Sequence, residues 1–127
     1  MNIDNTNILV FAYLGDTIFE NFVRYKLVCD GIPNVNMLQK ESLKYVSAKN
    51  QASYLFKLME INFFTDDELD IIKRARNYKG KSRSKSCDVV TYKHATALEA
   101  VIGYLKLKGE QNRICELMEQ ILEGKLC

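Results

Sequence analysis

Apolar residues recur every three or four positions over residues 7–29, which is the period of an amphipathic helix. They stand at positions 8, 11, 14, 18, 22 and 25. Gly31 and Pro33 follow, and both residue types disfavour continuation of a helix. The pattern therefore predicts a first helix over residues 7–29.

The same period predicts further helices over residues 35–46, 48–60, 91–108 and 111–123. Thr65 and Glu68 have the spacing of a capping box, which predicts another helix that continues to about Asn77. Residues 78–88 are polar and basic, as expected of a loop. Because no alternating run is long enough for a strand, we expect an all-α bundle of five to seven helices in a single domain over residues 1–127.

The first predicted helix contains residues that a core helix does not need. Gly15 costs about 1 kcal/mol relative to alanine inside a helix, and Asp16 and Glu20 lie one turn apart on the same face. A close helix crossing with two solvated carboxylates would explain this pattern, and so would a group that binds near the backbone. From this helix alone, the crossing is the better explanation.

A second acid has similar surroundings. Glu99 is the only acid of residues 94–107, and it lies among small and apolar residues with Gly103 one turn later. A carboxylate there would be partly desolvated, which is unfavourable without a cation or a hydrogen-bond donor. If the two helices pack together, Asp16 and Glu99 could hold a divalent metal between them. Mg²⁺ suits such a site, because it binds through one or two carboxylates and keeps several waters.

The charges are distributed unevenly along the chain. The net charge is +2, but residues 73–85 hold seven cations and no acid, which leaves 11 cations against 16 acids elsewhere. The seven are Lys73, Arg74, Arg76, Lys79, Lys81, Arg83 and Lys85. A concentrated basic segment is typical of proteins that bind polyanions, although a solvated loop without a partner would carry the same charges.

Other function classes are poorly supported. The four cysteines form no CxxC pair and His94 is the only histidine, so neither a zinc site nor a two-histidine ribonuclease is expected. No stretch approaches about 18 consecutive apolar residues, so we expect no membrane span. The N-terminus, MNIDNTN, lacks the pattern of a signal peptide, and we therefore expect a cytoplasmic protein.

Several segments together resemble the ribonuclease III family. They are AYLGDTIFE (12–20), VSAKNQA (46–52), FFTDDELDIIKRARNYK (63–79) and TYKHATALEAVIGYL (91–105). The chain is most similar to the bacterial branch that has the catalytic domain without a double-stranded-RNA-binding domain. The resemblance implies an all-helical homodimer that hydrolyses double-stranded RNA with Mg²⁺, or with Mn²⁺ in its place, and leaves 5′-phosphate ends. Phe11, Leu14, Ile18 and Phe22 are candidates for the core or for the dimer contact.

The resemblance also implies roles for single residues. Asp16 matches the catalytic aspartate of the family's LGD motif and Glu99 matches its metal-binding glutamate, so both are expected as catalytic residues and metal ligands. Glu20 is expected to orient a water from the outer shell. The seven cations of residues 73–85, together with Asn77, are expected to contact RNA. For this branch the resemblance implies that the substrate is the 23S ribosomal RNA precursor, and a ribosomal protein that presents it is a candidate partner.

The sequence departs from full-length ribonuclease III at two positions. Ala12 replaces an acid one turn before the LGD aspartate, and Thr96 replaces an aspartate three residues before the glutamate. Both absences resemble the short bacterial branch, and with fewer ligands we expect weak Mg²⁺ binding. They also leave an alternative open, a catalytically inert RNA-binding or ribosome-assembly protein on the same fold. A helical interaction module with no RNA partner is a third possibility.

Overall fold

The computed structural model describes residues 1–80 and 87–126, and within them the chain is all-helical without a strand. A short 3-10 helix, Ile3–Asn5, precedes α1 (Ile8–Cys29), α2 (Val35–Val46), α3 (Ala48–Glu60), α4 (Asp66–Arg76), α5 (Val89–Leu107) and α6 (Gln111–Leu122). The predicted all-α fold is therefore confirmed. No helix of the described residues has the length and apolar character that a membrane span requires.

Local capping interactions determine where the helices begin. The capping box predicted for α4 is complete, because the Thr65 N–H donates to Glu68 Oε1 at 2.9 Å and the Glu68 N–H donates to Thr65 Oγ1 at 3.3 Å. In α5, Asp88 Oδ1 accepts a hydrogen bond from the Thr91 N–H at 2.8 Å. This cap starts α5 at Val89, two residues before the start that hydrophobic periodicity predicted.

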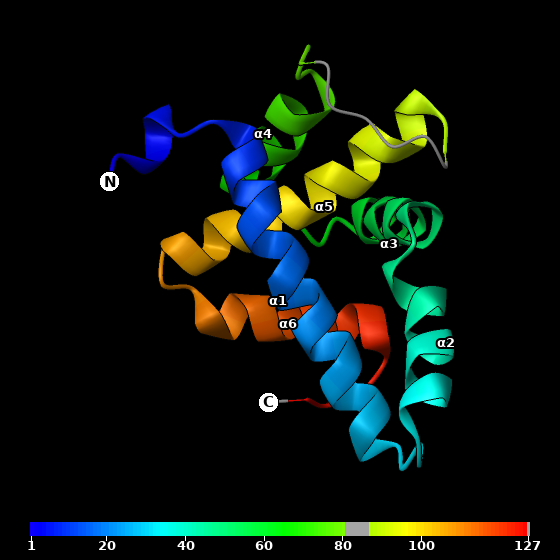
Figure 1. The fold of residues 1–127 in the computed structure, drawn as a ribbon. Coiled ribbons are helices and arrows are strands. Elements are labelled where there is room, and N and C mark those ends of the chain that lie inside the picture. The colour runs from blue at the N-terminus through cyan, green and yellow to red at the C-terminus, as the bar shows by residue number, and fades with distance from the viewer. Residues whose placement is uncertain (81–86, 127) are drawn as a thin grey trace.

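A single serine separates α2 from α3. Ser47 has an extended backbone, with φ −63° and ψ 149°, directly after the last residue of α2. Its side chain accepts a hydrogen bond from the Asn50 N–H at 3.3 Å and so caps α3. Figure 1 shows the resulting change of direction between the two helices.

The central helix of the bundle is α5. It packs against α1, α3, α4 and α6, and its buried residues extend from Ala95 to Leu105. Figure 1 shows α1 crossing α5. Phe19 and Val23 of α1 are fully buried in the same core as Leu98 of α5. The functional candidates on α1 and α5 are therefore attached to the most extensively packed pair of helices.

The four apolar candidates of the first helix are not equivalent. Phe11 is fully buried and belongs to the core. Leu14, Ile18 and Phe22 are only half-buried, so part of each side chain stays accessible in the single chain. Tyr13, beside them on α1, is 82% exposed. An apolar and aromatic surface of α1 is thus left uncovered.

Two glycines allow α1 and α5 to touch backbone to backbone. A Cβ atom at Gly15 would overlap the carbonyl oxygen of Glu99, and a Cβ atom at Gly103 would overlap the carbonyl oxygen of Phe11. Backbone atoms cannot rotate away as a flexible side chain can. The close crossing suggested by Gly15 is therefore present, and it accounts for a helix-weakening residue in the middle of α1.

Candidate active site

The crossing of α1 and α5 brings two carboxyl groups together. Asp16 follows Gly15 on α1 and is exposed, whereas Glu99 lies half-buried on α5. The two side chains lie close enough that Asp16 raises the pKa of the Glu99 carboxyl. Because Gly15 lies directly against the backbone of Glu99, the same contact that joins the helices sets the positions of both acids. The structure thus pairs the two residues that the sequence singled out.

The surroundings of Glu99 disfavour its charge. Burial raises the pKa of its carboxyl to about 9, and the hydrogen bond and the negative charge of Asp16 act in the same direction. The side-chain amide of Gln51, on α3, acts in the opposite direction, because its Nε2 donates to Glu99 Oε2 at 3.3 Å. Without a cation, Glu99 therefore keeps its proton at neutral pH.

This donor set fits a divalent cation of the Mg²⁺ type. In the described part of the chain, neither Asp16 nor Glu99 forms an ion pair with a lysine or arginine. A bound cation would compensate the charges that burial makes unfavourable. Nowhere in residues 1–80 and 87–126 do three or more potential ligands converge on one metal position. Two carboxylates are enough for Mg²⁺ when water and substrate oxygens complete its shell.

The positions at which full-length ribonuclease III has further acids lie on the same two helices. Ala12 is one turn before Asp16 on α1, and Thr96 is three residues before Glu99 on α5. Each is only 7% exposed. Since both side chains are buried and uncharged, neither adds a carboxylate to the site. The weak metal binding expected from the sequence stays a prediction.

Glu20 makes a contact that the sequence analysis did not include. Its carboxylate pairs with Arg24, one turn further along α1, at 2.8 Å. Arg24 is well exposed and Glu20 is partly exposed, and such a surface pair contributes only about 0.5 kcal/mol. The pair is weak enough to exchange for water, so the expected outer-shell role of Glu20 also stays a prediction.

The predicted RNA-contacting residues gather at the end of α4. Lys73, Arg74 and Arg76 lie in its last turn, Asn77 is its C-cap, and Lys79 follows. Lys81, Arg83 and Lys85 lie outside the described residues. The described members are therefore close together in space as well as in sequence.

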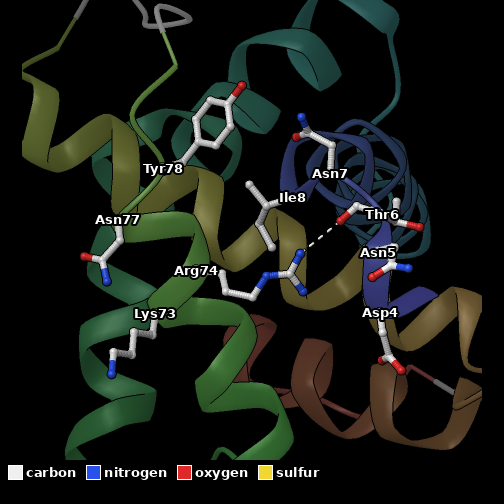
Figure 2. Close-up of a pocket in the computed structure, with 9 residues that line it drawn as sticks. All are labelled: Asp4, Asn5, Thr6, Asn7, Ile8, Lys73, Arg74, Asn77 and Tyr78. Atoms are coloured by element: carbon white, nitrogen blue, oxygen red, sulfur yellow. Dashed lines mark hydrogen bonds between the residues drawn. The ribbon is translucent and has the colours of Figure 1, made fainter. Parts of the chain in front are cut away.

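A pocket of about 630 Å³ opens between this end of α4 and the start of the chain (Figure 2). Its lining consists of Lys73, Arg74, Asn77, Tyr78 and residues 4–8. Arg74 Nη2 donates to the carbonyl oxygen of Thr6 at 2.9 Å, and the guanidinium lies 5.9 Å from the centre of the Phe11 ring. Arg74 thus also anchors the N-terminal segment to α4, while Lys73 and Asn77 are exposed.

Gln51 is the site residue that the sequence analysis missed. It stands on the buried face of α3 with Ala52, Leu55 and Leu58, and it is only 3% exposed. A glutamine on an otherwise apolar helix face is a signal that a polar partner lies opposite. The identity of that partner could not be read from the sequence, because Glu99 is 48 residues away.

Comparisons with known proteins agree with this geometry. The model of the Ribonuclease III domain family matches residues 9–110. The chain is 46% identical to the Mini-ribonuclease 3 of Brevibacillus brevis, over 94% of this chain and 90% of the relative. It is 44% identical to the Mini-ribonuclease 3 of Staphylococcus aureus, over 91% and 87% of the two chains.

A solved structure supports the same assignment. The crystal structure of a protein from Fusobacterium nucleatum superposes with a TM-score of 0.80 at 34% identity, covering 94% of this chain and 93% of that one. The family match and these relatives favour an enzyme over the inert RNA-binding protein and over the interaction module. The chain therefore belongs to the ribonuclease III family, in the Mini-ribonuclease 3 branch, and is an endoribonuclease.

Proposed function

We propose that the protein cleaves double-stranded RNA with Mg²⁺ and matures the ends of the 23S ribosomal RNA precursor. The observation that carries this proposal is the pair of neighbouring carboxyl groups, Asp16 and Glu99, at the α1–α5 crossing. Family membership indicates the reaction class, and the pair supplies a place where that reaction can occur. Mn²⁺ has similar ligand preferences, so we expect it to substitute.

The two acids have different tasks in this mechanism. A divalent cation, when bound, polarises the scissile phosphate and lowers the pKa of an attached water. Glu99, which is half-buried, would hold the cation and would have to release its proton to do so. Asp16, which is exposed, would be the second carboxylate ligand. The two carboxylates together offset the positive charge.

Basic residues at the end of α4 would hold the substrate. Lys73 and Asn77 line an open pocket (Figure 2), and they can contact phosphate oxygens. The pocket also includes Ile8, which precedes Asp16 by eight residues, or about 12 Å along the helix. Because A-form RNA hides its base edges in a deep and narrow groove, we expect recognition by shape, 2′-hydroxyls and phosphates.

We further propose that the enzyme acts as a homodimer. Tyr13 is 82% exposed on α1, beside the half-buried Leu14 and Ile18. Exposed aromatic side chains of this kind are enriched at protein interfaces. A two-fold dimer would place one acid pair at each strand of a duplex. A ribosomal protein that presents the precursor is a further candidate partner.

A cleavage time course on a perfect RNA duplex tests the proposed reaction. We expect discrete products with Mg²⁺ and none with EDTA, and we expect Asp16→Asn to keep duplex binding while it loses cleavage. Asp16→Asn that cuts at the wild-type rate would contradict the site assignment. If the wild type leaves the duplex intact but cuts a ribosomal precursor in the presence of a ribosomal protein, the range of substrates is narrower than proposed.

A further inference from the structure

Gln51 is a polar residue in an apolar position. It lies on α3 between the core residues that face α5, and it is as buried as its neighbours Ala52 and Leu58. A buried side-chain amide is unfavourable unless its hydrogen bonds are satisfied. A leucine or methionine at this position would fill the space without that cost. The presence of a glutamine here therefore indicates that a polar group opposite it forms a hydrogen bond with its amide.

That partner is the Glu99 carboxyl. Gln51 Nε2 donates to Glu99 Oε2 at 3.3 Å, across the contact between α3 and α5. Glu99 is thus held from two sides, by the amide of α3 and by Asp16 of α1. Three helices meet at this one side chain. Neither of its two partners, Gln51 of α3 and Asp16 of α1, carries a positive charge.

The chemistry of the donor matters as much as its position. An amide N–H orients a carboxylate oxygen but carries no net charge. A lysine or arginine at the same place would orient the oxygen and also neutralise it, which would compete with a bound cation. Gln51 can therefore fix the direction of the carboxylate and leave its charge for the metal.

We propose that Gln51 is a positioning residue, which holds the Glu99 carboxylate ready for a divalent cation. This inference rests on the proposed function, because it assumes that Asp16 and Glu99 bind the metal. A glutamate side chain without this bond would sample several rotamers, and most of them would turn the carboxylate away from Asp16. Residues that orient a metal ligand typically change metal affinity by 10- to 100-fold when they are replaced.

Gln51→Met tests the proposal, because methionine matches the length and flexibility of glutamine and cannot donate the bond. Mn²⁺ binding to the full-length protein is measured by electron paramagnetic resonance, with the metal alone and no RNA. We expect binding about tenfold weaker than in the wild type, and a correspondingly higher Mg²⁺ concentration for half-maximal duplex cleavage. Gln39→Met, at an exposed glutamine of α2, is the matched control and should bind Mn²⁺ as the wild type does.

A purely structural role for Gln51 predicts a different result. In that case Gln51→Met would change the melting temperature but leave Mn²⁺ affinity and the Mg²⁺ dependence of cleavage unchanged, and the proposal would be wrong. If Gln51→Met does not fold, Gln51→Asn replaces it in the test. This variant keeps the side-chain amide, but its side chain is one methylene shorter and the amide lies farther from Glu99. We expect Gln51→Asn to weaken Mn²⁺ binding as well, and wild-type affinity in that variant would overturn the proposal.

The same measurement separates this inference from the proposed function. If the wild type binds Mn²⁺ and cuts duplex RNA, and Gln51→Met binds Mn²⁺ with the same affinity, only the positioning role of Gln51 is rejected. A wild-type protein that neither binds Mn²⁺ nor cuts RNA rejects the metal site itself, and the role of Gln51 with it.

Discussion

Two glutamates of this bundle are shielded from water, Glu68 fully and Glu99 in part, and their partners are opposite in kind. Glu68, on α4, is paired with Arg113 of α6, whose Nε and Nη2 donate to the two carboxylate oxygens at 2.8 and 2.9 Å. Glu68 also accepts the N–H of Thr65 at 2.9 Å. Burial alone would raise the pKa of Glu68, but the hydrogen bonds from Arg113 and Thr65 outweigh it and hold the pKa below its usual value.

Glu99 has no such compensation within the described residues. Burial raises its pKa to about 9, and the charged group that adds to this shift is another acid, Asp16. The neutral amide of Gln51 is the donor that opposes this shift. Burial is thus common to both glutamates, and the charge of the partner decides the direction of the pKa shift.

We propose that this difference separates a structural acid, Glu68, from a functional one, Glu99. A buried carboxylate that is paired with a cation of its own chain needs no further ligand, and the ion pair connects two helices. The charged form of a buried carboxyl beside a second acid is unfavourable in the isolated protein, and a bound cation would make that charged form favourable. Strongly perturbed groups of the second kind are typical of active sites. The variants below test whether the two glutamates differ in this way.

The largest expected effect is on catalysis. Glu99→Gln should lower Mg²⁺-dependent cleavage of duplex RNA by more than about 100-fold, since loss of a residue that merely supports a ligand already costs up to that factor. Initial rates at saturating Mg²⁺ measure the effect. Glu68→Gln is the control and should cut at a rate close to the wild type at a temperature where it stays folded. Equal losses in both variants would remove the distinction between the two acids.

The second effect is on stability and concerns Arg113. Arg113→Ala leaves Glu68 buried without its cation, and it also removes the bond from Nη2 to the Phe63 carbonyl oxygen at 2.6 Å. We expect the free energy of unfolding to fall by about 3 kcal/mol, measured by urea denaturation. Arg24→Ala breaks the exposed pair with Glu20 and should cost less than about 1 kcal/mol. Similar losses in the two variants would mean that Arg113 does not stabilise the interior.

The third effect links stability to the site. Gly15→Ala places a Cβ atom against the carbonyl oxygen of Glu99, so α1 and α5 must move apart. We expect a loss of about 2 kcal/mol in unfolding free energy together with reduced cleavage, because the acids separate. Gly124→Ala, where a Cβ would meet open space, is the control. Unchanged stability and cleavage in Gly15→Ala would show that the close crossing is not needed.

The last effect is a change of stability with pH in metal-free protein, which is spread over several pH units. The folded state holds a proton on Glu99 up to about pH 9, whereas the unfolded chain releases it near the ordinary value of 4.5. Stability should therefore fall as pH rises between these values, and Glu99→Gln should flatten that slope. Glu68 should act in the opposite direction, because its contribution is present above pH 4.5 and is lost as pH falls through its lowered pKa. Melting curves in EDTA for wild type and Glu99→Gln measure the slope, and identical slopes would contradict the assignment.

Most of the fold could be predicted because the signals that define helices are local. The capping box of Thr65 and Glu68 lies within four residues, and the apolar periodicity of α1 and α6 is short-range. The early start of α5 was missed because its first residues, beside Asp88, do not follow the apolar period. The predicted contacts of Lys81, Arg83 and Lys85 with RNA lie outside the described residues.

The acid pair could be predicted and its supporting contacts could not. Asp16 and Glu99 were recognisable because each is an acid with a glycine nearby in a largely apolar stretch, and because both match motifs of the ribonuclease III family. The partners of Glu99 and Glu68 are 48 and 45 residues away, so no local pattern identifies them. A polar residue on an apolar face, such as Gln51, shows only that some partner exists.

The most direct test of this account is Mn²⁺ binding to the wild type, Asp16→Asn, Glu99→Gln and Glu68→Gln, measured by electron paramagnetic resonance without RNA. We predict the same Mn²⁺ affinity for the wild type and Glu68→Gln, and a large loss of Mn²⁺ affinity in both Asp16→Asn and Glu99→Gln. Unchanged Mn²⁺ binding in Asp16→Asn and Glu99→Gln would contradict the central claim that these two carboxylates form the metal site.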